Sequence, residues 1–116
     1  MKFTELLPFK KFIKIENVPD DVIATLKSEL ISNPLKGDTI ASTGGVRKIP
    51  ISLKGKGKSG GARVIYLYIQ LEHEIFLITG YSKNVQTDLT ADQKKKIKNL
   101  VVELKSQKQL TEIDEA

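Results

Sequence analysis

Two apolar runs joined by a short polar turn constrain the fold of this 116-residue chain more than any other feature. The first run, ARVIYLYIQL, occupies residues 62–71, and the second, IFLITGYS, occupies residues 75–82. Both are rich in β-branched and aromatic residues, which is typical of strands. A turn from Glu72 to Glu74 is too short for a crossover connection, so the two strands must be antiparallel. The sequence therefore predicts a β-hairpin in the middle of the chain.

The residues before this hairpin predict a strand, an ambiguous segment and a helix. FTELLPF, near the N-terminus, fits a short strand with Pro8 at its end, and KKFIKIEN fits either a helical turn or a strand. Asp20 and Asp21 then open a helix, because acidic residues favour the first turn and apolar residues recur after them at helical spacing. Pro34 marks the end of that helix.

A further strand and a closing helix complete the expected architecture. VRKIPIS, residues 46–52, fits a strand in which Pro50 argues for an edge or a bulge. If this strand is extended, Lys48 and Pro50 share one face and Arg47 shares the other face with its isoleucines. The closing helix opens at TDLTADQ with Asp88 or Thr90 as N-cap, and its apolar stripe comprises Ile97, Leu100, Val101 and Leu104.

The final segment, about residues 107–116, is polar and acidic, and we expect it to be frayed. The chain contains no long linker, so the sequence predicts one domain over residues 1–116. Segregated helices beside an antiparallel sheet of at least three strands make this an α+β fold.

Positive charge is concentrated in the middle of the chain. The net charge is +5, yet no Asp or Glu occurs from Thr39 to Leu71. The rest of the chain holds 13 cations and 14 anions, so all of the net positive charge belongs to this window. Such a local excess indicates a polyanionic partner. The six cations of the window are Arg47, Lys48, Lys54, Lys56, Lys58 and Arg63.

The composition argues against several kinds of chemistry. Without cysteine the chain has no disulfide and no thiolate nucleophile. The basic window has no carboxylate for a two-metal nuclease. His73 is the single histidine and lies in the predicted turn, so a histidine pair cannot supply acid–base catalysis. No apolar run approaches the roughly 20 residues that span a bilayer, and the N-terminus lacks a signal peptide; we expect a cytoplasmic protein with no membrane partner.

The remaining side chains can bind RNA and can also cut it. The RNA 2′-hydroxyl can attack the adjacent phosphorus, and Lys and Arg can neutralise the charge that develops on the phosphate oxygens. Crowding of cations lowers a lysine pKa, so that one lysine can serve as a base. Taken alone, the Lys- and Gly-rich segment GKGKSGG fits a plain surface loop better than an RNA-binding one.

Three motifs, in their order along the chain, resemble the RelE/HigB-type toxins of bacterial toxin–antitoxin pairs. They are GDTIASTGGVRKI (37–49), GKGKSGGARVIYLY (55–68) and IFLITGYSKNVQTDLTADQ (75–93). The resemblance implies two N-terminal helices packed on a mostly antiparallel four-stranded sheet, with a C-terminal helix. It also implies a metal-independent endoribonuclease that needs no cofactor and cuts mRNA on the ribosome. A cognate antitoxin, expected to be a helix-turn-helix protein, would hold it inactive.

The resemblance also implies roles for individual residues. Arg47 and Arg63 would stabilise the transition-state charge, and Lys48 or Lys56 would transfer a proton. Tyr81 is the nearest phenol and completes the expected catalytic set. The residues expected to bind the RNA backbone are Lys54, Lys58, Lys83 and Asn84, and no metal ligand is expected.

The chain departs from the family pattern at several positions. Ser42 stands where a glycine is usual, Pro50 where a basic residue is frequent, and Val85 where an acidic residue is common. Leu89 and Thr90 occupy the stretch in which some relatives carry a catalytic tyrosine. Two other functions remain compatible with the same charges: a non-catalytic domain that binds RNA or ribosomes, and a toxin of this fold directed at DNA gyrase.

Overall fold

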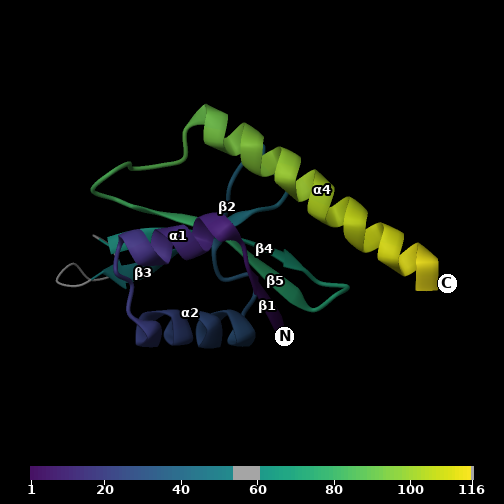
Figure 1. Ribbon diagram of the computed structural model, residues 1–116, viewed down its shortest axis with the longest axis horizontal. Helices are drawn as coiled ribbons and strands as arrows, with labels where there is room; N and C mark the ends of the chain where they lie inside the picture. The colour runs from purple at the N-terminus through teal and green to yellow at the C-terminus, as the bar shows by residue number, and fades with distance from the viewer. Residues whose placement is uncertain (54–60, 116) are drawn as a thin grey trace.

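A computed structural model describes residues 1–53 and 61–115, with side chains up to Gln107 (Figure 1). Its elements, in chain order, are β1 (Lys2–Glu5), α1 (Leu7–Ile15), α2 (Asp20–Ser32), β2 (Asp38–Thr39), β3 (Arg47–Leu53), β4 (Gly61–Ile69), β5 (Glu74–Ser82) and α4 (Ala91–Glu115). The strands form one sheet in the order β1-β5-β4-β3-β2. β1 runs parallel to β5, and the other neighbours are antiparallel.

The predicted mixture of helices with a mostly antiparallel sheet is confirmed. The predicted number of four strands was wrong, because the sheet has five strands, with one parallel pair. β2 was missed because a two-residue strand is too short to reveal an alternation of apolar and polar residues. The parallel pairing of β1 joins segments about 70 residues apart, and sequence periodicity carries no information on such pairing. There the Thr4 hydroxyl donates a 2.6 Å hydrogen bond to the Glu74 carboxylate.

The N-terminal segment differs from the prediction at Pro8, which lies in the first turn of α1 rather than in a strand. A proline is tolerated there because the first amide groups of a helix have no partner within the helix. The ambiguous segment that follows is helical as far as Ile15, and α1 buries Phe9 and Phe12. α2 begins at Asp20, as predicted from the acidic residues of its first turn.

The central hairpin is confirmed as β4 and β5, and its turn covers residues 70–73. His73 lies in this turn with a φ of 50°, in agreement with the prediction. Glu74 was predicted to belong to the turn but is the first residue of β5 and is buried. Its contacts with β1 explain the difference, since the carboxylate accepts from Thr4 and lies 3.8 Å from the Lys2 ammonium.

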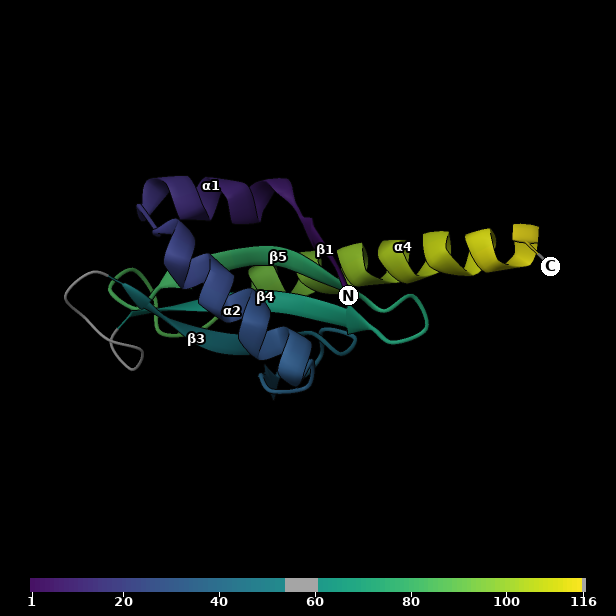
Figure 2. The ribbon, with the colours of Figure 1, turned by 90° about the horizontal axis from the view of Figure 1, so that it is seen from below.

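Apolar side chains cover both faces of the sheet. On one face, α1 and α2 pack over a cluster that includes Ile49, Val64 and Tyr66. α4 lies on the other face (Figure 2). There Ile97 and Val101 pack over Ile65 and its neighbours, which confirms the predicted helix stripe. The face on which a strand residue lies therefore decides which helices surround it.

α4 continues to Glu115, through most of the segment that was expected to be frayed, and its C-terminal half extends beyond the sheet (Figure 1). Near its middle, the Lys105 ammonium donates a 2.8 Å hydrogen bond to the Gly44 carbonyl. In the described part of the chain, no helix combines the length and apolar character needed to cross a membrane.

Candidate active site

Arg63 and Tyr81 lie directly opposite each other in the β4–β5 pair, on the face that α4 covers. Arg63 also lies opposite Pro50 of β3, and Lys48 lies one step along the same face of β3. Because side chains alternate between the two faces of a strand, these positions bring Lys48, Arg63 and Tyr81 to one end of one face. Three adjacent strands thus present an ammonium, a guanidinium and a phenol to a common surface.

The Tyr81 phenol is the most unusual group of this set. The residue is 6% exposed, and its hydroxyl is buried without a hydrogen-bond partner among the described residues. Its pKa is raised above the usual value of 10.0, chiefly by burial and further by the negative charge of Asp88, while Arg63 opposes the shift. Tyr81 is therefore protonated at neutral pH and has a proton to donate. A buried polar group without a partner is costly, which indicates that it serves something other than stability.

Arg63 and Lys48 supply positive charge beside this phenol. Arg63 is half-buried, and its Nη1 donates a 3.1 Å hydrogen bond to the Ala62 carbonyl, which orients the guanidinium. The Lys48 ammonium lies 3.8 Å from an Asp88 carboxylate oxygen. Because both side chains of that pair contact solvent, the interaction contributes at most about 1 kcal/mol. An anionic ligand could therefore replace Asp88 beside Lys48.

The loop between β5 and α4 carries Asp88 over the site, and glutamines fix it. The Gln86 amide nitrogen donates to the Asp88 carbonyl at 2.7 Å and to the Gln93 amide oxygen at 2.8 Å. Thr90 is the N-cap of α4, since its hydroxyl accepts from the Gln93 amide N–H and its own N–H donates back to the Gln93 side chain. Of the two predicted N-caps, Thr90 is therefore correct, and Asp88 instead faces Lys48.

Sequence reasoning missed Asp88 as a member of the site. Its backbone position is fixed by the Gln86 contact, and its carboxylate accepts a 2.8 Å hydrogen bond from the Leu89 amide N–H. The one available signal was that it directly precedes the closing helix in a chain whose basic window is free of acids. That signal identified a helix cap and not a neighbour of Lys48.

Arg47 lies on the opposite face of β3 and is not brought together with the other predicted catalytic residues. It pairs with Tyr66 of β4, which belongs to the core under α1 and α2. Its guanidinium donates to the carbonyls of Gly37 at 2.7 Å and Leu35 at 3.1 Å. Arg47 therefore fastens the segment between α2 and β2 to the sheet.

Tyr66 completes this structural network. Its hydroxyl donates to the Pro34 carbonyl at 2.8 Å and accepts from the Gly37 amide at 2.9 Å. Burial raises the pKa of Tyr66, opposed by the Gly37 hydrogen bond and by the charge of Arg47. A Cβ added at Gly37 would lie 2.8 Å from the Lys48 carbonyl oxygen, so this approach requires glycine.

The remaining predicted RNA-binding residues fall into two groups. Lys83 and Asn84 directly follow β5, where the Lys83 amide donates to the Gly61 carbonyl and the Asn84 amide to the Ser82 hydroxyl. Both lie near the end of the sheet that carries Arg63 and Tyr81. Lys54, Lys56 and Lys58 lie outside the described residues. Within the described ranges, no three His, Asp or Glu side chains gather as metal ligands would.

The comparison with protein families agrees with this architecture. A family model described as the RelE toxin of the RelE / RelB toxin-antitoxin system matches residues 1–116. Toxins of this family are generally ribonucleases, and membership of the family implies a cognate antitoxin as partner. The match extends over the whole sheet, both N-terminal helices and α4, so it includes every element of the candidate site. This chain belongs to the RelE toxin family.

Proposed function

We propose that this chain is a toxin that cuts mRNA without a metal ion, with the ribosome as its expected setting. One observation carries the proposal: Lys48, Arg63 and Tyr81, from three adjacent strands, share one end of one sheet face. Two cations and a neutral phenol suit a reaction in which negative charge develops on a phosphate. The expected substrate is RNA rather than DNA, because the 2′-hydroxyl of RNA supplies the nucleophile.

The proposed step is an in-line transfer within the RNA. The 2′-oxygen forms a bond to the adjacent phosphorus while the bond from phosphorus to the 5′-oxygen of the next nucleotide breaks. The proton of the 2′-hydroxyl passes to a base, and the leaving 5′-oxygen receives a proton from an acid. The products are a 2′,3′-cyclic phosphate and a free 5′-hydroxyl, and no water, metal or redox partner is consumed.

Each proposed role follows from the chemistry of its side chain. Arg63 stabilises the phosphorane, since a guanidinium can bind two phosphate oxygens and always carries its charge. Tyr81 donates its proton or a hydrogen bond toward the phosphate, because its raised pKa keeps the hydroxyl protonated and that hydroxyl has no other partner among the described residues. Lys48 or Lys56 accepts the proton of the 2′-hydroxyl. The incoming phosphate takes the place that Asp88 holds beside Lys48.

Arg47 is not part of this mechanism, although the resemblance implied that it stabilises the transition state. Its guanidinium is engaged by two backbone carbonyls on the far face of the sheet. We propose that Lys54, Lys58, Lys83 and Asn84 bind the RNA backbone and hold it in line for the attack.

The test is cleavage of a defined mRNA on purified ribosomes by the wild-type chain and by Arg63→Ala. We expect Arg63→Ala to lose about 100-fold or more in rate, as when a single oxyanion donor is removed. Lys98→Ala, which removes an exposed cation of α4 away from the site, is the matched control and should keep full activity.

The product ends distinguish the proposal from its alternatives. We expect 2′,3′-cyclic phosphate and 5′-hydroxyl ends, because self-attack by the 2′-hydroxyl must leave them. Ends with a 3′-hydroxyl and a 5′-phosphate, as metal-activated water leaves, would contradict the mechanism. RNA binding without cleavage would favour the non-catalytic alternative, and arrest of replication with intact mRNA would favour the gyrase-directed one.

A further inference from the structure

The outer edge of β5 is only partly covered. β1 pairs with β5 from Glu74 to Leu77, and the last hydrogen bond runs from the Leu6 amide to the Leu77 carbonyl at 3.0 Å. The chain then turns away into α1. On its other side, β5 stays paired with β4 as far as Ser82. Among the described residues, no strand pairs with the outer edge from Ile78 to Ser82.

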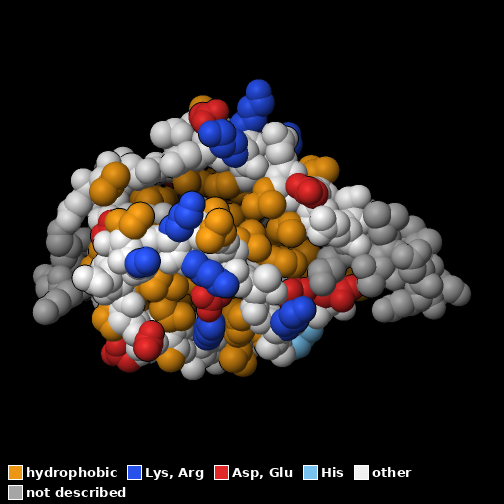
Figure 3. Space-filling view, in the orientation of Figure 1, with side chains coloured by type: hydrophobic (Ala, Val, Ile, Leu, Met, Phe, Trp, Pro, Cys, Tyr) orange, Lys and Arg blue, Asp and Glu red, His pale blue; other side chains and the backbone are white. Residues whose placement is uncertain are grey.

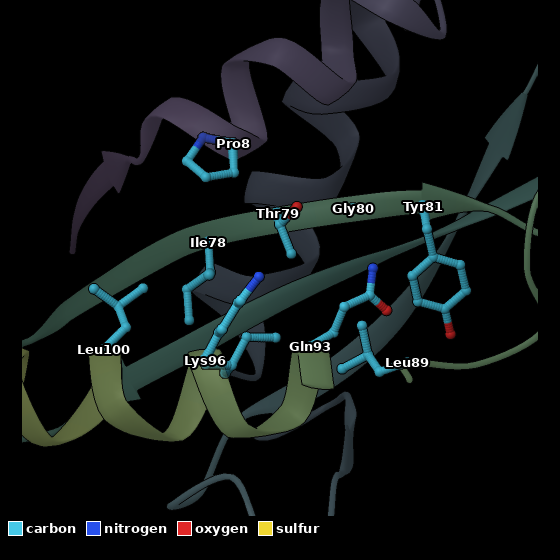
Figure 4. A pocket seen from close by; sticks show the side chains of 10 residues that line it. Pro8, Ile78, Thr79, Gly80, Tyr81, Leu89, Gln93, Lys96 and Leu100 are labelled. Carbon is cyan, nitrogen blue, oxygen red and sulfur yellow. The ribbon is translucent and has the colours of Figure 1, made fainter. Parts of the chain in front are cut away.

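This edge forms the floor of a long groove between α1 and α4, which we call the β5-edge groove. Two cavities of about 270 and 350 Å³ lie along it and adjoin at Pro8, Gly80 and Tyr81, which line both. Figure 4 shows the lining of the first. Ile15 and Val85 line its open end while 78% and 75% exposed. Figure 3 shows a hollow with hydrophobic side chains in this region. Such a concave apolar surface marks an interaction site for protein.

The helices on either side of the groove are basic. α1 contains three lysines and no acidic residue, and residues 91–100 of α4 contain four lysines and one aspartate. Lys11 and Lys96 line the groove from its two sides, and Glu16 is the one acidic residue among the described residues of its lining. The occupant that complements this surface is an extended peptide with apolar side chains and acidic flanks. Exposed isoleucine and valine side chains argue for protein rather than RNA.

The backbone of β5 can bind such a peptide as an added strand. The Lys83 amide donates to the Gly61 carbonyl across the β4–β5 pair, and hydrogen-bonded positions alternate along an antiparallel ladder. The same alternation turns the amide groups of Gly80 and Ser82 away from β4. Strand addition uses outward backbone groups of this kind, while flanking pockets take alternate side chains.

We propose that the β5-edge groove binds an extended, acidic-flanked segment of the cognate antitoxin, which pairs with β5 between Ile78 and Ser82. The partner rests on family membership, and the consequence for activity rests on the proposed function. Tyr81 lines the groove and also belongs to the candidate site. A strand held there fixes the end of β5 and the loop that follows it. Tyr81 and Asp88 then stay in the positions that they hold without RNA, with Asp88 beside Lys48.

The test uses matched variants in an Arg63→Ala background, so that cells tolerate the toxin and the readout is binding alone. The probe is the product of the reading frame adjacent to the toxin gene, co-expressed and then titrated by calorimetry. Ile15→Asp and Lys11→Glu alter the groove. The controls are Ile31→Asp, at an exposed helix-end isoleucine of α2, and Lys10→Glu, which neighbours Lys11 on α1.

We expect about tenfold or greater loss of affinity for each groove variant, as for an interface hot spot, and near wild-type affinity for the controls. NMR hydrogen exchange should also gain protection at the Gly80 and Ser82 amides in the complex. Equal binding by groove and control variants, or no binding to the wild-type chain, would overturn the proposal. So would a free chain that is a dimer and becomes monomeric in Ile15→Asp, or groove variants that lose RNA binding instead.

This experiment is independent of the proposed function. If groove variants lose the antitoxin while the wild-type chain fails to cut mRNA, the docking proposal stands and the ribonuclease proposal fails. If mRNA is cut but the groove variants bind the antitoxin normally, the ribonuclease proposal stands and the docking proposal fails.

Discussion

Arg47 and Lys48 are neighbours in the chain, yet their side chains leave β3 on opposite faces. The Arg47 guanidinium donates to the Gly37 carbonyl at 2.7 Å under the N-terminal helices, whereas the Lys48 ammonium lies 3.8 Å from the Asp88 carboxylate under α4. One cation therefore serves the fold and the other faces the candidate site. Replacement of Arg47 should therefore lower stability, whereas replacement of Lys48 should affect activity.

Arg47→Ala should lower the free energy of unfolding by about 1–3 kcal/mol, because two backbone carbonyls lose their charged donor. Lys48→Ala should change it by less than about 1 kcal/mol, because a solvent-contacting ion pair contributes little. Urea titration of both variants checks this. Equal losses of stability would contradict the division of roles, as would unchanged cleavage in Lys48→Ala when Lys56 is also replaced by alanine.

The two buried tyrosines should respond oppositely to loss of the hydroxyl. Tyr81→Phe removes a buried hydroxyl that lacks a partner, so we expect a gain of roughly 1 kcal/mol in stability together with a loss of cleavage. Tyr66→Phe leaves the Gly37 amide and the Pro34 carbonyl without their partner and should cost about 1–2 kcal/mol. Urea titration and the ribosomal cleavage assay give both quantities. A Tyr81→Phe variant with full activity would remove Tyr81 from the mechanism.

Stability should fall steeply in alkali. Burial raises the pKa of both Tyr66 and Tyr81 in the folded chain, whereas tyrosine in the unfolded chain titrates near pH 10. Above about pH 10 the unfolded state therefore releases protons that the folded state retains, and stability declines as pH rises toward the folded pKa values. Lysines also titrate there, so the control is Tyr66→Phe/Tyr81→Phe. Its stability should fall less between pH 9 and about 11; parallel curves would contradict the assignment.

The pairing of Arg63 with Tyr81 was not predicted, because its register depends on a β-bulge between Ile65 and Tyr66. The hairpin was predicted from its two apolar runs and short turn, and alternation along each strand decides which residues share a face. The same alternation separates Arg47 from Lys48, yet the family resemblance had assigned both to catalysis. Pro50 was correctly predicted at an edge, since β2 pairs with β3 only at Arg47 and Lys48. The parallel pairing of β1 with β5 and the position of Asp88 depend on contacts between distant segments, which local periodicity does not encode.

Replacement of Asp88 tests whether its carboxylate keeps anions out of the site before RNA binds. Asp88→Asn keeps an oxygen that can accept from the Leu89 amide but removes the negative charge beside Lys48 and Tyr81. We expect RNA affinity at low salt to rise about two- to fivefold, the equivalent of one exposed ion pair, and this gain to shrink at high salt. Fluorescence anisotropy with a single-stranded RNA, in the Arg63→Ala background and in the wild type, measures it. Asp92→Asn, which removes an exposed carboxylate of α4 paired with Lys96, is the control and should leave affinity nearly unchanged. Should Asp88→Asn bind RNA as the wild type does but lose cleavage, the carboxylate would be a proton carrier in the reaction rather than a competitor of the phosphate.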